Sequence, residues 1–583
     1  GKHGAIRING EELVFEDGTP LNFWGITVVS RAMFPNYDEA EKIADRIAQL
    51  GFNAVRFHAP HFATDTKGGI DLLGSSTRRS DGVSELYMDR LCYFMAELGK
   101  RGIYFGMDLI TSGLTWKNNN YQDDGKLDHS TRGPNFFDEE TIKLQNKMAE
   151  NYLSYKNPYT GTTIGTDPAL AFVSLYNETS IFMVKNFDSW EYYYPKMKKL
   201  YNDWLCQKYP TRNDLEAAWT ERESEFPGLL DPEDQTEGTV ELYQATQRKK
   251  CNNRRFEDNM EFLADMQLTN MKERFAEIRK WAPNALLQGS TCYTSGTDDR
   301  GNIYSQAKGG DYYSMQTYFY LAVGNGEQMI KGTKISKPES AFTSSKLQFM
   351  SFFANAKIFN KPYFLTEWDN GMPNPFRSEF TLLMGAYAQF QNWNPFLFTW
   401  DYRCNYNYRK NIPESEKYLH SQHSLGDRPE MLYSLPVVAL MVHRKDVEKA
   451  QEGYFSTRYR GKEVFSRAKQ SIGGDIAYAW CGKSGGMMID DISYDPDYNS
   501  NRILKLKRYG DETGKYISYT GEMMFDTNTL TYKLNTDRTQ AAAGYINHME
   551  LEDVIFDIKN KFSTVYLTSL SKENKNILEL SQK

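Results

Sequence analysis

Short apolar runs recur along the first three quarters of the chain, separated by segments with apolar residues at helical spacing. The clearest run, residues 170–176, reads Leu-Ala-Phe-Val-Ser-Leu-Tyr, as expected for a strand covered by helices on both faces. Residues 37–50 illustrate the helical pattern, with Ile43 and Ile47 on one face and Gly51 as the stop. The pattern predicts eight strands, at residues 21–27, 52–57, 103–109, 170–176, 286–291, 312–318, 362–366 and 395–400.

Eight strands alternating with helices predict an α/β fold, a (β/α)8 TIM barrel, because a doubly wound open sheet would need no eighth strand. We assign the barrel to residues 21–446, with a helical insertion after strand four at about residues 190–279. Residues 1–20 contain Asn-Gly and Asp-Gly turns, which predict a β-hairpin that plugs the bottom of the barrel. Residues 447–583 show short alternating strands without a helical period, which predicts a C-terminal β-sandwich domain.

Carboxylates follow two of the predicted strands. Asn177 and Glu178 end strand four, and Glu367 ends strand seven. Active sites of barrels lie at the C-terminal ends of the strands, and strands four and seven face each other across the barrel. Two glutamates about 5–5.5 Å apart would suit a retaining glycosidase. The alternative is that Glu178 is a solvated loop carboxylate.

The two carboxyl groups would need different pKa values. Burial and a neighbouring negative charge would keep Glu178 protonated as the general acid, whereas hydrogen bonds would keep Glu367 ionised as the nucleophile. These two glutamates are therefore the candidate catalytic residues.

Three motifs carry a family resemblance. Asn177-Glu178 and the Thr-Glu-Trp motif around Glu367 resemble the acid/base and nucleophile motifs of clan A retaining glycoside hydrolases. These (β/α)8 enzymes include families 5, 35 and 42. Residues 52–58, Phe-Asn-Ala-Val-Arg-Phe-His, resemble the second-strand motif of the same clan.

The resemblance implies roles for further residues. Arg56 would hydrogen-bond the nucleophile, and Tyr318 would contact the same carboxylate. Trp400 would form the floor of the −1 subsite, and Asn177 would bind the sugar 2-hydroxyl. Alternatively, Arg56 forms a plain core salt bridge and Trp400 belongs to the core.

The chain also departs from the clan pattern. Thr179 stands where family 5 often has proline, and Gln316-Thr-Tyr replaces the His-x-Tyr of many members, which leaves a family 5 substrate unsupported. Residues 208–219 are similar to a segment of family 42-like galactosidases. Residues 535–544 resemble β-sandwich domains that follow such barrels.

Other candidate substrate-binding residues are Trp24 in the first strand, His58 after the second, and Arg403 after the eighth. Arg403 and Arg409 would recognise a sulfated or uronic sugar through bidentate hydrogen bonds, unless this run is only a solvated loop. The pairs His58/His61 and His420/His423 invite a metal hypothesis, but their proline and loop contexts argue against paired ligands. We therefore predict no metal and no cofactor.

Composition limits the classes of molecule that the protein is expected to bind. Aromatic residues make up 14% of the 583 residues, and flat rings with polar tips suit sugar faces. The net charge of −7 argues against nucleic acid. No apolar run approaches the ~20 residues of a membrane span, so no membrane partner is expected. The six cysteines form no CxxC pair.

The sequence thus predicts a retaining β-glycoside hydrolase that acts on an oligo- or polysaccharide by double displacement. The alternatives are a catalytically inactive carbohydrate-binding barrel and a metal-dependent barrel hydrolase. The lack of a charged, then apolar leader leaves open a cytosolic protein or an exported one whose signal peptide has been removed. The sugar, its linkage and the oligomeric state stay open.

Overall fold

The structure of the protein is a computed structural model. The residues that it describes are 2–58, 83–110, 133–291, 300–320, 338–372, 374–399, 423, 425–451, 453–460, 464–465, 476–489, 513–570 and 579–582.

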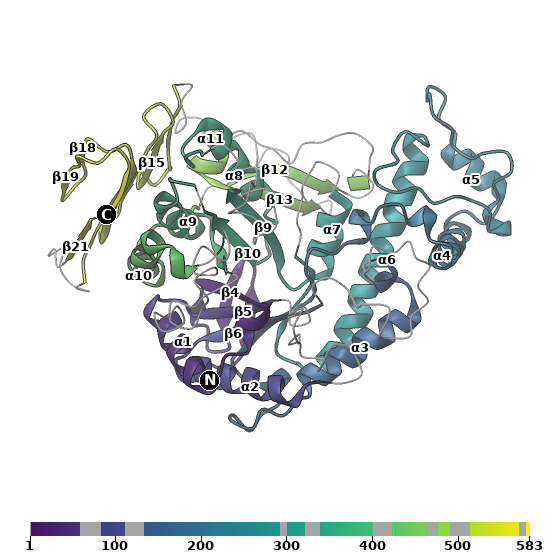
Figure 1. Cartoon of the computed structure of the whole chain (residues 1–583). Coiled ribbons are helices and arrows are strands. Elements are labelled where there is room, and N and C mark those ends of the chain that lie inside the picture. Colours follow the sequence, from purple (N-terminus) through teal and green to yellow (C-terminus); the bar gives the residue numbers. More distant parts are fainter. Residues whose placement is uncertain are drawn as a thin grey trace, which may run out of the picture.

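A parallel eight-stranded sheet curls into a barrel at the centre of the molecule (Figure 1). The hydrogen-bonded order β8-β7-β6-β5-β4-β11-β10-β9 is the cyclic order of a (β/α)8 barrel. The edge between β8 and β9 is bridged by a hydrogen bond from the Asp311 N–H to the Leu287 carbonyl, 2.8 Å long. The predicted TIM barrel is therefore confirmed. Its strands are β4 (Gly25–Val29), β5 (Ala54–His58), β6 (Tyr104–Ile110), β7 (Leu170–Tyr176), β8 (Leu286–Ser290), β9 (Tyr313–Tyr320), β10 (Tyr363–Asn370) and β11 (Trp393–Thr399).

Helices cover the outside of these strands. Local sequence sets their ends: Asn36 and Glu39 form a capping box before α1, and Gly51 follows it with a φ of +81°. The helices of the barrel layer are α1 (Tyr37–Gln49), α2 (Glu85–Lys100), α3 (Glu139–Leu153), α6 (Asn253–Arg279), α7 (Arg300–Gly309), α8 (Ser344–Ala356), α9 (Ser378–Gln391) and α10 (Pro429–Arg444).

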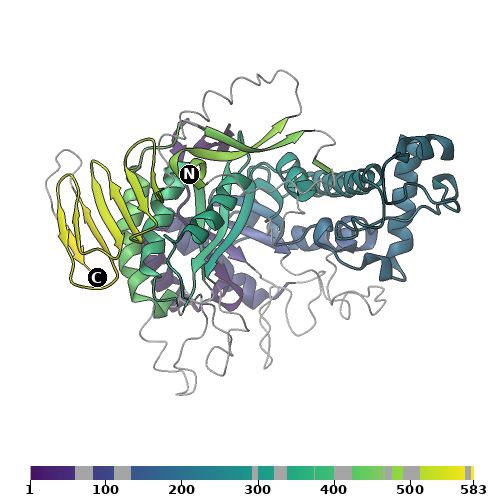
Figure 2. The ribbon, with the colours of Figure 1, turned by 90° about the horizontal axis from the view of Figure 1, so that it is seen from above.

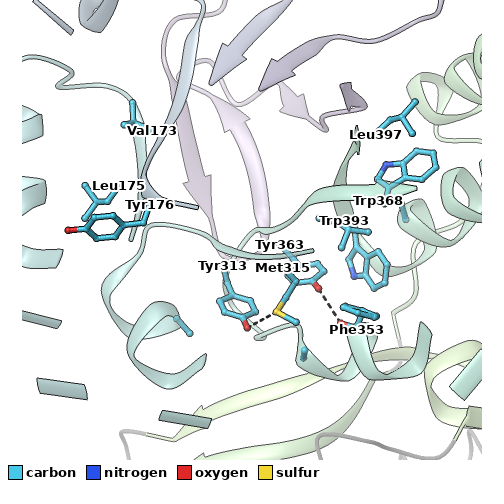
Figure 3. Packing of buried hydrophobic residues seen from close by; sticks show 14 of the residues in the cluster. Val173, Leu175, Tyr176, Tyr313, Met315, Phe353, Tyr363, Trp368, Trp393 and Leu397 are labelled. Carbon is cyan, nitrogen blue, oxygen red and sulfur yellow. Dashed lines mark hydrogen bonds between the residues drawn. The ribbon is translucent and has the colours of Figure 1, made fainter. Parts of the chain in front are cut away.

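Aromatic side chains fill much of the layer between strands and helices. Figure 3 shows Tyr313, Tyr363 and Trp393 on three neighbouring strands. The Tyr363 ring lies 5.9 Å from Tyr313 and 5.3 Å from Trp393, and its hydroxyl donates to the Phe353 carbonyl of α8. This packing fixes β9, β10 and β11 against the helical layer, and these strands carry several of the site residues described below.

The N-terminal strands close the bottom of the barrel, as the sequence predicts. Phe15 and Leu21 pack in one buried cluster with Phe23, Phe172 and Phe396 from inside the barrel. The strands of this plug are β1 (Ile6–Asn9), β2 (Glu12–Phe15) and β3 (Pro20–Leu21). With its bottom filled by apolar side chains, the barrel presents polar groups at the opposite, C-terminal ends of its strands.

The helical insertion after β7 extends from one side of the barrel, and the C-terminal sheet packs on the opposite side (Figures 1 and 2). The insertion contains α4 (Tyr193–Lys208) and α5 (Arg212–Trp219) and returns through α6. Its core includes a buried bidentate ion pair between Arg255 and Glu233, with both N–O distances 2.6 Å.

The C-terminal region differs in part from the prediction. An antiparallel sheet is present, but a parallel pair and a helix precede it. The helix was not predicted because it is a six-residue segment fixed by tertiary contacts: Trp480 is buried against Tyr387 of α9 and Phe525 of the sheet. The elements are β12 (Gly453–Arg460), α11 (Ile476–Cys481), β13 (Lys483–Ile489), β14 (Lys515–Ile517), β15 (Met523–Asp526), β16 (Thr531–Asn535), β17 (Thr539–Gly544), β18 (His548–Glu550), β19 (Ile555–Asp557), β20 (Ser563–Thr568) and β21 (Glu579–Gln582).

Among the described helices, none combines the length and apolar content needed to cross a bilayer.

Candidate active site

Glu367 lies on β10, buried near the C-terminal ends of the barrel strands, with 3% of its surface exposed. Arg56 Nη1 and Gln316 Nε2 donate to its Oε1, at 2.8 and 2.7 Å, and the Tyr318 hydroxyl donates to its Oε2. Three donors on β5 and β9 thus bind one carboxylate. Hydrogen bonds of this kind favour the ionised form of a carboxyl group.

Arg56 links Glu367 to a second carboxylate, Asp108 on β6. The guanidinium is fully buried, and its Nη2 lies 2.6 Å from Asp108 Oδ2. Burial alone would lower the pKa of Arg56, but the charges of Asp108 and Glu367 raise it. Burial would raise the pKa of Asp108, yet Arg56 and His58 hold it below its usual value. Arg56 and Asp108 therefore both stay charged.

His58, at the end of β5, is held by the same aspartate. Its Nδ1 lies 2.6 Å from Asp108 Oδ2, and its Nε2 lies 3.9 Å from Glu367 Oε1. A carboxylate at Nδ1 fixes the orientation of an imidazole ring. The Nε2 edge is thereby directed toward the Glu367 carboxylate.

Asn177 lies directly after β7 and joins this cluster. Its Oδ1 accepts hydrogen bonds from Arg56 Nη2 at 2.8 Å and from Gln316 Nε2 at 2.7 Å. These contacts fix the rotamer of the amide, so its Nδ2 is the part of the side chain that can donate to a ligand. Gln316 contacts both Asn177 and Glu367 and so bridges β7 and β10.

Glu178 follows with a backbone φ of +43°, a left-handed conformation that is unfavourable for glutamate. Hydrogen bonds made by the residues before and after Glu178 hold its backbone in this conformation. The Asn177 N–H donates to the Ile110 carbonyl at 2.9 Å, and the Thr179 N–H donates to Ser290 Oγ at 3.0 Å. Strained backbone of this kind concentrates at functional sites.

The charges of Glu178 and Glu367 both affect the pKa of Tyr318. Burial raises the pKa of this phenol well above its usual value, and the charges of Glu367 and Glu178 raise it further. The two carboxylates that the sequence places on strands four and seven are therefore neighbours of one tyrosine. Tyr318 stays protonated and remains a hydrogen-bond donor.

A second charged cluster, which was not predicted from the sequence, adjoins the first. His423 Nδ1 lies 2.7 Å from Asp369 Oδ2, and Arg428 Nη1 donates to Asp369 Oδ1 at 2.5 Å. The His423 ring packs 5.2 Å from both Tyr318 and Phe398, and Phe398 also contacts His58. The sequence offered two signals: His423, which was considered only as a metal ligand, and Asp369, two residues beyond Glu367 on the same strand.

The structure contradicts the prediction that Trp24 binds substrate. It is fully buried, its ring stacks on Phe52, and it lies 5.8 Å from Trp368, in the cluster between strands and helices. Phe23, its neighbour, faces the barrel interior instead. Because side chains alternate along a strand, Trp24 faces the helices and not a substrate.

Several candidates lie outside the described residues, namely Trp400, Arg403, Arg409, His61 and His420. Their assigned roles stay predictions. In the described part of the chain, no group of three or more His, Cys, Asp or Glu side chains is arranged to hold a metal ion.

Comparisons with known proteins bear on the fold. No family model matches the chain, and no curated protein matches it significantly. A β-galactosidase from the Antarctic haloarchaeon Halorubrum lacusprofundi is similar in structure, with a TM-score of 0.51 at 12% identity, over 80% of this chain and 67% of that one. This likeness shows a shared barrel fold.

Two further solved structures are similar at lower scores. The β-galactosidase from the psychrophilic Marinomonas ef1 gives a TM-score of 0.48 at 13% identity, over 82% of this chain and 74% of that one. The endo-1,4-β-mannanase from Rhizomucor miehei gives 0.44 at 12% identity, over 76% of this chain and 100% of that one.

Proposed function

We propose that the protein is a retaining β-glycoside hydrolase that cleaves an oligo- or polysaccharide by double displacement. The observation that carries this proposal is the set of donors around Glu367. Hydrogen bonds from Arg56, Gln316 and Tyr318 orient this buried carboxylate, and the charges of Glu367 and Glu178 both affect Tyr318. A solvated loop carboxylate would need none of these contacts.

In this mechanism Glu367 attacks the anomeric carbon and forms a covalent glycosyl-enzyme. Glu178 protonates the leaving oxygen, then takes a proton from the water that releases the sugar. Tyr318 and Arg56 hold the nucleophile in place. Asn177 Nδ2 donates to the 2-hydroxyl, a contact that strengthens as positive charge develops on the ring.

The inactive carbohydrate-binding barrel is the competing proposal. Loss of either carboxylate is the simplest route to it, and both Glu178 and Glu367 are present.

The test is the stereochemistry of hydrolysis. The full-length protein is incubated with a panel of aryl β-glycosides of galactose, glucose and mannose, together with plant, yeast and algal polysaccharides, and proton NMR follows the first anomer released. The proposal expects the β-anomer first. Release of the α-anomer first contradicts the retaining mechanism, and binding without turnover across the panel supports the inactive alternative.

A further inference from the structure

Arg274, on α6, is a fully buried arginine without a carboxylate partner among the residues that the structure describes. Four arginines among the described residues are 0% exposed, and each of the other three has a carboxylate partner. Arg56 pairs with Asp108 and Glu367, Arg255 pairs with Glu233, and Arg428 pairs with Asp369. Arg274 Nη1 makes a long contact of 3.4 Å to the Ile142 carbonyl, and the side chain also interacts with the Tyr176 hydroxyl.

Arg274 does not avoid the cost of a buried charge by losing its proton. Burial lowers the pKa of Arg274 from its usual value, and the nearby Tyr176 and Glu277 act in the opposite direction. Glu277 itself is partly exposed on the same helix and accepts from Lys280 Nζ at 2.7 Å. A guanidinium keeps its proton in proteins, so the buried positive charge requires a counter-charge.

The surroundings of Arg274 supply more donors. In the described structure, the donors Arg274 Nε and Nη2, Asn135 Nδ2 and Gln145 Nε2, together with the acceptor Asn135 Oδ1, are buried atoms that lack a hydrogen-bond partner. Their residues are all 0% exposed and come from α6, from the short 3-10 helix Pro134–Phe136, and from α3. Unsatisfied buried donors are rare in native proteins and point to a bound water or ion.

All three residues interact with one hydroxyl, that of Tyr176 at the end of β7. Tyr176 donates to Gln145 Oε1 at 2.8 Å and contacts Asn270 Oδ1 at 3.2 Å and the Asn135 carbonyl at 3.4 Å. Burial raises the pKa of Tyr176 to about 12, and the charge of Arg274 acts against this shift. The phenol is therefore neutral and does not balance the arginine.

We propose that this cluster is a buried site for a small monovalent anion, with chloride as the physiological ligand, held by Arg274, Asn135 and Gln145. One guanidinium neutralises one negative charge, which disfavours phosphate and sulfate. Water alone would satisfy the amides but would leave the charge unbalanced. Because Tyr176 precedes Asn177 and Glu178, a bound anion stabilises the strand end that carries them. The proposal stands independently of the proposed catalysis.

Two measurements on the full-length protein test it, and neither uses activity. In the first, crystals are soaked in sodium bromide and the anomalous difference density of bromide is mapped. The proposal expects a peak within hydrogen-bond distance of Arg274 Nε or Nη2. Density for water without anomalous signal at this place overturns it.

In the second, thermal unfolding is followed while chloride replaces gluconate at constant ionic strength. The proposal expects a saturable rise in Tm of about 2–4 °C. Arg274→Gln should abolish the rise. Arg279→Gln, the same change at an arginine of α6 that pairs with Asp311 at the surface, should retain it. An equal Tm of the wild type in both salts overturns the proposal. If Arg274→Gln does not fold, the bromide map of the wild type decides.

Discussion

The phenolic hydroxyl of Tyr318 donates to Oε2 of Glu367, on the side of the carboxylate opposite the donors from Arg56 and Gln316. A neutral phenol therefore orients the proposed nucleophile without adding charge. Deleting the hydroxyl oxygen of Tyr318 removes this contact without changing the rest of the side chain.

Tyr318→Phe should lower kcat about 10- to 100-fold, because a hydrogen bond to a charged group contributes about 1.5–3 kcal/mol. Steady-state kinetics on an aryl β-glycoside measure the effect. Tyr313→Phe is the matched control, since Tyr313 lies on the same strand but donates to Met315 Sδ in the packing layer. Turnover by Tyr318→Phe equal to that of the control would show that the contact has no catalytic role.

Glu178→Ala should separate the two chemical steps. A general acid contributes typically about 10²- to 10⁴-fold, and an activated leaving group such as dinitrophenolate does not need protonation. We expect a large loss with a phenyl glycoside and a much smaller loss of the first step with the dinitrophenyl glycoside. Pre-steady-state bursts of phenolate release report this difference. Equal losses on both substrates would remove Glu178 from the acid/base role.

Asp369→Asn should destabilise the fold by about 3–5 kcal/mol, because it leaves the charge of Arg428 buried without its carboxylate. Urea unfolding at neutral pH measures the change. Asp557→Asn is the matched control, since Asp557 makes the same 2.7 Å contact to a histidine Nδ1 but is largely exposed. The control should lose less than about 1 kcal/mol, and a similar loss in both variants would contradict the argument.

Glu379 is a buried carboxyl group on α9 that predicts a pH-dependent stability. Burial raises its pKa from 4.5 to about 8, against hydrogen bonds from the Ala341 N–H and Ser340 Oγ. Between pH 4.5 and about 8 the folded state keeps a proton that the unfolded state has lost. Its stabilising contribution is therefore complete below pH 4.5 and is lost as pH rises toward 8.

Glu379→Gln should flatten this dependence by a few kcal/mol across that range, as measured by urea unfolding at several pH values. Glu430→Gln is the control, because Glu430 occupies the corresponding second position of α10 but forms a partly exposed ion pair with Arg377. The control should keep the slope of the wild type. An unchanged slope in Glu379→Gln would show that this carboxyl is not the source.

The barrel strands could be predicted because buried parallel strands are encoded locally, as continuous apolar runs. Residues 170–176 coincide with β7, and its terminal Asn177 and Glu178 follow at once. The order of such strands around a barrel is also fixed, which predicts that Glu178 and Glu367 face each other across the barrel.

The hydrogen-bond partners could not be predicted, because they depend on register and on long-range pairing. Trp24 was misassigned because one residue of register decides whether a strand side chain faces the barrel interior or the helices. Asp369 and His423 are 54 positions apart and meet only through the fold. The buried Arg274 resembled any helical arginine, since its missing partner is a three-dimensional property.

The most direct test of the central claim is azide rescue of Glu367→Ala. Without the carboxylate no glycosyl-enzyme can form, so turnover of a dinitrophenyl β-glycoside should fall by several orders of magnitude. Azide should occupy the space of the carboxylate, attack the anomeric carbon and restore part of the rate. The account predicts that NMR identifies an α-glycosyl azide, the inverted product. A variant that retains wild-type turnover and yields no glycosyl azide would contradict the assignment of Glu367 as nucleophile.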